Sequence, residues 1–147
     1  MKLKSFAALF LTAICLCSVF SVTAFAETDT TFAVTRNISP AYEIANNATS
    51  ILVIDGSTAN CSSQVYGANI VSITVTQTLQ KYWGLWIWTD VNDAKTSKTV
   101  NDSSLYLSTT KIGLSSGTYR VESVFTLTNK DGKTETITVY SDEKSVN

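Results

Sequence analysis

The stretch Thr118-Tyr-Arg-Val-Glu-Ser-Val-Phe-Thr-Leu-Thr128 decides the fold class of this 147-residue chain. Every second position from Tyr119 to Leu127 is apolar apart from Ser123, and the positions between them are mostly polar. A period of two is typical of a β-strand that buries one face and exposes the other. The stretch therefore predicts a half-buried strand in an antiparallel sheet.

The residues after this stretch predict a hairpin with a defined register. A three-residue loop at Lys130–Gly132 would place Phe125 opposite Ile137, so that apolar side chains meet on the buried face. A two-residue loop would instead place Val124 opposite Val139 and would mix apolar and polar residues on both faces. Because a slip of one residue moves every side chain to the other face, burial selects the three-residue loop.

Glycine at the end of this loop supports the same register. A type I turn followed by a left-handed residue needs glycine at its last position. Gly132 stands there, directly before Lys133. We therefore predict a positive φ at Gly132 and pairing of Asn129 with Lys133.

The rest of the chain from Ser50 onward has the composition of further strands. Val, Ile, Thr, Tyr and Trp dominate it, and no stretch shows a sustained helical period. Asn92–Asp102 is polar and is predicted to be a loop. About seven strands are expected, at Ile51–Asp55, Thr58–Tyr66, Ile70–Lys81, Trp83–Val91, Leu105–Thr109, Thr118–Thr128 and Thr134–Tyr140. This pattern predicts one all-β domain over residues 50–147, an antiparallel sandwich.

The residues before Ser50 divide into two parts. Lys2 and Lys4 precede an uncharged apolar run over residues 6–20, and Ala24 and Ala26 form an A-x-A site. This order predicts a cleavable signal peptide over residues 1–26, and therefore a secreted, extracellular protein. Residues 27–49 lack periodicity and hold the single proline. We expect a linker or loose arm there, which could include a short strand near residues 42–44.

The segment Leu114-Ser-Ser-Gly-Thr-Tyr-Arg-Val121 resembles the start of strand F in immunoglobulin-like domains. In those domains a tyrosine just inside the strand bonds back to the preceding corner through its hydroxyl, so the resemblance implies this role for Tyr119. Antibody domains place a cysteine two residues later, where this chain has Val121. Cys61 would lie near the partner position on strand B. The resemblance thus implies an immunoglobulin-like β-sandwich without the inter-sheet disulfide.

A wider set of residues between Ser50 and Ser141 is similar to a group of small secreted proteins of Gram-positive bacteria. The resemblance implies export and a sandwich fold, and it transfers no catalytic residue. The residues that carry it are Leu79-Gln80-Lys81, Trp86, Gly117-Thr118-Tyr119-Arg120-Val121, Glu135 and Ser141.

Several classes of chemistry are not expected. The chain has no histidine, which removes the usual general base near neutral pH and the commonest metal ligand. Its carboxylates are scattered over turns, termini and the polar loop, and that loop departs from EF-hand spacing. We therefore expect no enzyme, no catalytic residue, no metal site and no cofactor. Cys61 is the only cysteine after residue 26 and is expected to be a buried thiol.

The charge of the chain gives no reason to expect a nucleic-acid partner. Of 11 basic residues, Lys2 and Lys4 lie in the predicted signal peptide, so nine remain against 12 acidic residues, a net charge of −3. Phosphate backbones are bound by clusters of lysine and arginine, and none is present. No apolar run after residue 26 is long enough to span a membrane.

All three tryptophans lie in Tyr82-Trp-Gly-Leu-Trp-Ile-Trp88. In a continuous strand, Trp86 and Trp88 would share one face, and Leu85 and Ile87 would take the other. Two interpretations follow. In one, Tyr82, Trp83, Trp86 and Trp88 form an exposed binding platform; in the other, Trp86 is the core tryptophan of the sandwich. Both can hold if Trp86 is a core residue and Trp83 or Trp88 is exposed. In the second case Trp86→Ala would destabilise the fold and Trp88→Ala would not.

These observations favour a secreted, non-catalytic binding module. Its partner would be an extracellular glycan, a cell-wall polymer or a protein, met by the aromatic segment. The alternative is a secreted structural or antibacterial effector protein whose tryptophans serve the core.

Overall fold

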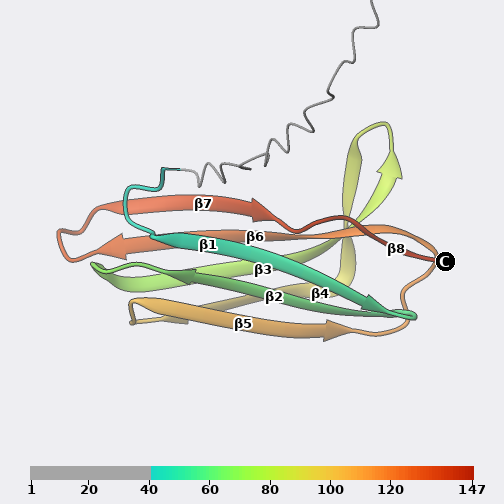
Figure 1. Ribbon diagram of the computed structural model, residues 1–147, viewed down its shortest axis with the longest axis horizontal. Helices are drawn as coiled ribbons and strands as arrows, with labels where there is room; N and C mark the ends of the chain where they lie inside the picture. The colour runs from blue at the N-terminus through green and yellow to red at the C-terminus, as the bar shows by residue number, and fades with distance from the viewer. Residues whose placement is uncertain (1–40) are drawn as a thin grey trace, which may run out of the picture. The chain divides into compact units, whose positions relative to one another are not determined.

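Eight strands form two antiparallel sheets in the computed structural model, which describes residues 41–147 (Figure 1). The first sheet has the order β1-β2-β5 and contains β1 (Asn47–Asp55), β2 (Thr58–Tyr66) and β5 (Ser104–Lys111). The second has the order β4-β3-β6-β7 and contains β3 (Ile70–Gly84), β4 (Ile87–Val100), β6 (Gly117–Asn129) and β7 (Thr134–Tyr140). A short strand, β8 (Lys144–Val146), pairs with the start of β6.

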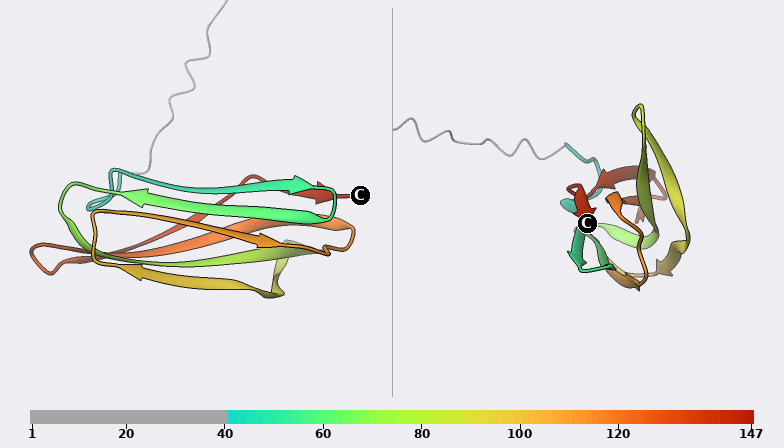
Figure 2. Two further views of the ribbon diagram at one scale, coloured as in Figure 1. Left: turned by 90° about the horizontal axis from the view of Figure 1, so that it is seen from below. Right: turned by 90° about the vertical axis from the view of Figure 1, so that its right-hand side faces the viewer.

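The expected all-β antiparallel sandwich is therefore confirmed. The two sheets lie face to face (Figure 2), and strands β2 and β7 have the bounds that the sequence predicts. The central stretch of β6 alternates as expected, because Tyr119, Val121, Ser123, Phe125 and Leu127 are all buried. The predicted signal peptide and the arm up to residue 40 lie outside the described residues.

The β6–β7 hairpin has the predicted register. Phe125 pairs with Ile137, and the Asn129 amide donates to the Lys133 carbonyl oxygen at 2.9 Å. Gly132 has a φ of 77°, the left-handed conformation that the turn requires. The Asn129 side-chain oxygen also accepts from the amides of Asp131 and Lys133.

Two sequence predictions about the β3–β4 hairpin are wrong. Trp83–Val91 is not a separate strand, because β3 continues to Gly84 and the chain reverses at the two residues that follow. Asn92–Asp102 is not a loop, because β4 runs through it as far as Val100. Strand β4 lies at the edge of its sheet and its side chains are mostly exposed, so its threonines and lysines reflect an edge position.

Residues at the end of the predicted arm belong to the sandwich. Residues 42–44 form no strand, but Ile44, Ala45 and Ala48 are buried in the core. The Glu135 carboxylate holds this segment, since it accepts from the amides of Glu43 at 3.0 Å and Ile44 at 2.9 Å. Strand β1 accordingly begins three residues before Ser50.

The core consists of two apolar clusters with a polar layer between them. One cluster contains Phe125 and Leu127, and the other contains Tyr119 and Val121. Ser123 lies between these pairs along β6 and is fully buried. The polar layer, which we call the polar belt, consists of Ser50, Ser63, Gln77, Thr109 and Ser123.

Hydrogen bonds in the polar belt join the two sheets. The Gln77 side-chain amide donates to the Ser63 hydroxyl at 2.6 Å, and this hydroxyl lies 2.7 Å from that of Ser123. The Ser123 hydroxyl is in turn 2.8 Å from that of Ser50. Within residues 41–147, no buried side-chain nitrogen or oxygen lacks a partner. The belt therefore carries no desolvation penalty from an unpaired group.

Two local expectations about the core are confirmed. The Tyr119 hydroxyl donates to the Ser115 carbonyl oxygen at 2.7 Å, which is the corner contact implied by the resemblance to strand F. Cys61 is a buried free thiol in the same cluster as Tyr119. Val121 packs in this cluster too, and no disulfide links the sheets within residues 41–147.

Candidate binding site on the β3–β4 hairpin

The β3–β4 hairpin extends beyond the sandwich (Figures 1 and 2). Strand β3 pairs with β6 only as far as Lys81, opposite Tyr119, and beyond this point it pairs with β4 alone. The segment that holds all three tryptophans is therefore the free end of a two-stranded ribbon. A ribbon of this kind has no second layer to cover its side chains.

The hairpin closes through a strained two-residue turn. Gly84 pairs with Ile87, and Leu85 and Trp86 between them have φ angles of 50° and 66°. Positive φ at both positions is the mark of a type I′ turn, which normally contains Asn-Gly or a similar pair. A bulky residue in this conformation costs about 1–3 kcal/mol. A register shift between Tyr82 and Gly84 also leaves Trp83 without a pairing partner.

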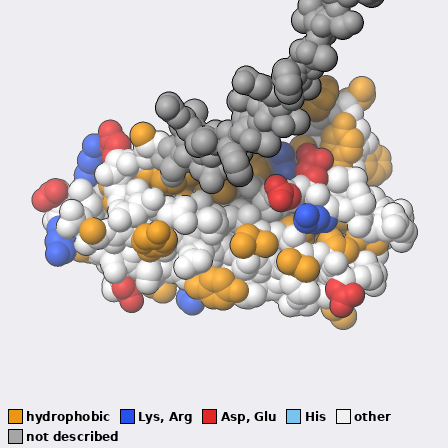
Figure 3. Space-filling model, viewed as in Figure 1, with side chains coloured by type: hydrophobic (Ala, Val, Ile, Leu, Met, Phe, Trp, Pro, Cys, Tyr) orange, Lys and Arg blue, Asp and Glu red, His pale blue; other side chains and the backbone are white. Residues whose placement is uncertain are grey.

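Four large apolar side chains are exposed around this turn. The exposed fraction is 76% for Trp83, 87% for Leu85, 91% for Trp86 and 50% for Ile87. We call these four residues the hairpin tip. Hydrophobic side chains gather over the projecting hairpin in the space-filling view (Figure 3).

The prediction that Trp86 is a core residue is therefore wrong. The chain reversal at this residue breaks the alternation that would have brought its indole inward. No tryptophan is among the buried residues that the structure describes, and Tyr119 and Phe125 are the largest fully buried side chains. Trp86 and Trp88 also do not form one strand face, because one lies in the turn and the other in β4.

Trp88 is held at the base of the hairpin instead. Its ring centroid lies 5.2 Å from that of Tyr82, its cross-strand partner. The Arg120 guanidinium carbon lies 4.1 Å from the centroid of Trp88 and 4.1 Å from that of Tyr140, so the cation is stacked between the two rings. These contacts leave Trp88 half-buried.

Polar side chains fix the stacked arginine. The Arg120 Nε donates to Gln80 Oε1 at 3.0 Å, and the Gln80 amide donates to Asp90 at 3.2 Å. The Tyr140 hydroxyl donates to Glu122 at 3.0 Å, and this hydrogen bond is the main reason that the pKa of Tyr140 is raised. The base of the hairpin is thus a satisfied network on the outer face of the second sheet.

The four predicted binding residues lie on one hairpin but in two groups. Trp83 and Trp86 belong to the tip, whereas Tyr82 and Trp88 belong to the base. Sequence reasoning missed Leu85 and Ile87 as tip residues because it assigned them to a strand face. It also missed Arg120 and Tyr140, whose contact with Trp88 depends on how β3, β4, β6 and β7 are ordered.

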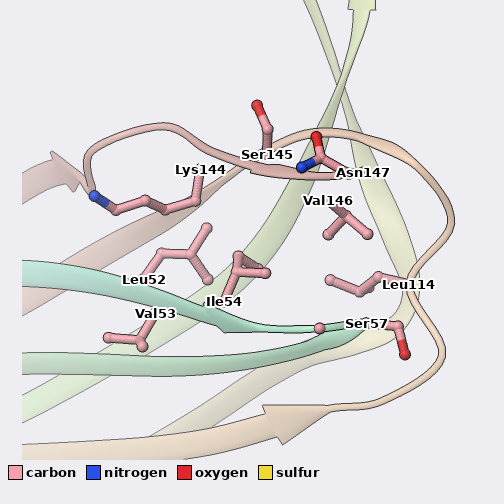
Figure 4. A pocket seen from close by; sticks show the side chains of 10 residues that line it. Leu52, Val53, Ile54, Ser57, Leu114, Lys144, Ser145, Val146 and Asn147 are labelled. Carbon is pink, nitrogen blue, oxygen red and sulfur yellow. The ribbon is translucent and has the colours of Figure 1, made fainter.

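A separate hollow of about 790 Å³ lies near the C-terminus (Figure 4). Leu52 and Ile54 from β1 face Leu114 and Val146 across it, and Lys144 stands at its border. It contains none of the residues that the sequence predicts for binding. In the described part of the chain, three or more acidic, cysteine or histidine side chains nowhere gather as they would around a metal ion. Residues 41–147 also contain no helix that is long and apolar enough to cross a membrane.

Comparison with known proteins gives distant structural similarity only. No family model matches the chain, and no curated protein matches its sequence. One crystal structure of OgpA from Akkermansia muciniphila is similar over 67% of this chain and 29% of OgpA, with 14% identity and a TM-score of 0.34. Spo0M, a sporulation control protein from Bacillus subtilis, is similar over 71% of this chain and 49% of its own, with 14% identity and a TM-score of 0.32. The chain thus spans less than half the length of either protein.

Proposed function

We propose that this chain is a secreted, non-catalytic binding module that meets its partner through the hairpin tip. The observation that carries the proposal is the exposure of Leu85 and Trp86 in a two-residue turn where both have positive φ. Bulky apolar residues at such positions cost stability and gain no packing in the isolated protein. Backbone strain of this kind clusters at functional sites.

The tip has the character of an energetic hot spot. Two indoles and two aliphatic side chains project from a closed turn, and large rigid aromatic side chains lose little conformational entropy on binding. The network around Arg120 holds the base of the ribbon and so orients the tip. The sandwich supplies the rigid support.

Export is part of the same proposal. The basic start, apolar run and A-x-A site over residues 1–26 support secretion, as does the resemblance to small secreted proteins of Gram-positive bacteria. The exposure of Trp86 removes support from the alternative, a structural or effector protein whose tryptophans serve the core.

Capture experiments test this proposal. The exported protein is incubated with whole cells, purified wall polymers, a glycan panel and lipid vesicles, and retention is compared with that of Trp86→Ala. We expect at least one of these targets to retain the native protein and to retain much less of the Trp86→Ala variant. Tyr106→Ala is the matched control, since Tyr106 is an exposed aromatic residue on β5 of the other sheet. Equal retention of native protein and Trp86→Ala by every target would contradict the proposal.

A further inference from the structure

We infer that the partner of the hairpin tip is the interfacial region of a lipid bilayer, into which Trp83, Leu85, Trp86 and Ile87 insert. This inference rests on the proposed function and names the partner class. It places the protein on a membrane surface, and residues 41–147 contain no helix long and apolar enough to cross the membrane.

The chemistry of the tip fits this environment. Residues 82–89 carry no charge, and the first charged residues on either side are Lys81 and Asp90 at the base of the hairpin. Charged groups are expensive in hydrocarbon, and this segment brings none. Tryptophan and tyrosine concentrate at membrane interfaces because their rings are apolar and carry one polar group. The side chains of Leu85 and Ile87 have no group that could form a hydrogen bond with a sugar hydroxyl.

The shape of the tip also fits a bilayer surface. A two-residue turn makes a narrow, projecting end (Figure 1), and the hollow near the C-terminus is lined by none of the tip residues. The three steps along the strand from Lys81 to Gly84 span about 10 Å at the rise of a β-strand. Interfacial apolar segments insert about 5–10 Å into the boundary between headgroups and acyl chains. The uncharged part of the hairpin is thus as long as the depth to be filled.

Part of the tip backbone already has hydrogen-bond partners within the hairpin. An amide without a hydrogen-bond partner is costly in an apolar medium. The Trp86 amide lies in the turn and donates to the hydroxyl of Tyr82 at 3.4 Å. Gly84 and Ile87 pair with each other across the turn. The ribbon therefore supplies partners for part of its end, and Trp83, which has no cross-strand partner, is the exception.

Charge predicts which lipids matter. Without residues 1–26 the chain carries nine basic and 12 acidic residues, and the tip itself is neutral. Attraction to anionic lipids requires clustered basic side chains. Insertion should therefore proceed into zwitterionic bilayers and should be insensitive to salt.

Sedimentation with phosphatidylcholine vesicles tests the inference on the exported protein. We expect the native protein and Tyr106→Ala to bind equally, with a blue shift of tryptophan emission, at low and high salt. Leu85→Ala and Trp86→Ala should each weaken binding about tenfold, the loss expected when one large apolar side chain leaves the interface.

A double variant separates insertion from folding. Leu85→Asn with Trp86→Gly creates the Asn-Gly pair that type I′ turns prefer, so the hairpin should form at least as well as in the native protein. Its melting temperature should be unchanged or higher, whereas its vesicle binding should be lost. Vesicle binding that persists in this variant, or that is abolished by salt, would overturn insertion of the tip.

Vesicle binding and the capture experiments together distinguish the lipid inference from the proposed function. If vesicles do not retain the native protein, but whole cells, a wall polymer or a glycan retain it and fail to retain Trp86→Ala, the lipid inference fails and the proposed function stands. If neither vesicles nor any other target distinguishes the native protein from Trp86→Ala, both fail.

Discussion

At the scale of single residues, the tryptophans divide by position. Trp86 contacts solvent at the turn, whereas Trp88 packs against Tyr82 and Arg120. Trp88→Ala should therefore lower the free energy of unfolding by about 1–3 kcal/mol, through lost packing and a lost cation–π contact. Trp86→Ala should leave the free energy of unfolding nearly unchanged. Urea denaturation of both variants measures this, and a larger loss for Trp86→Ala would contradict the assignment.

Cys61 should react slowly in the native protein. Burial raises the pKa of its thiol from 9.0 to about 11, against a smaller opposite effect of its hydrogen bond with Thr109. At about pH 8 a thiol reagent should label the denatured chain much faster than the native protein, because only the thiolate reacts and the native side chain is covered.

The same raised pKa predicts a loss of stability at high pH. The thiol of the unfolded chain ionises at a lower pH than that of the folded chain. The stabilisation it gives is complete below pH 9.0 and is lost as pH rises towards 11. Cys61→Ala should show a shallower decline in melting temperature over this range, because the other titrating groups are common to both proteins. Parallel declines would contradict this explanation.

At the scale of elements, the polar belt should contribute measurably to the sandwich. Gln77 is fully buried and bonds to both Ser63 and Thr109 of the other sheet. Gln77→Leu should lower the free energy of unfolding by about 1–3 kcal/mol, since it leaves a polar partner unpaired in the core. Thr126→Ala on the exposed face of β6 is the control. A Gln77→Leu variant as stable as the native protein would mean that water or rearrangement satisfies the belt.

The two long hairpins differ in how far the sequence predicts them. The β6–β7 hairpin was predictable because alternation selects one register and Gly132 stands where the turn needs it. The β3–β4 hairpin was not predictable, because leucine and tryptophan rarely form turns, although Leu85 and Trp86 form this one. The sequence around the reversal therefore looks like that of a continuous strand. Sequence therefore identified the aromatic segment of the candidate site but not its arrangement, which depends on a strained turn.

At the scale of the whole domain, Glu135 fixes the N-terminal segment to the sandwich. Its carboxylate accepts from the amides of Glu43 and Ile44, and the Ile44 side chain is buried in the core. Glu135→Ala should raise the hydrogen-exchange rates of these two amides and lower the melting temperature, because residues 44–48 would lose their anchor. Exchange rates unchanged from the native protein would show that burial of Ile44 alone holds the segment.

The separation of the hairpin tip from the core also bears on how such a domain can change over time. None of the four tip residues belongs to either apolar cluster, so the tip can vary without altering the sandwich. Replacement of Leu85 or Trp86 by glycine or asparagine would even relieve strain. A scaffold of this kind is evolvable: new recognition sequences can arise between Gly84 and Ile87 while selection on folding acts elsewhere. It is equally a natural frame for grafting short peptides.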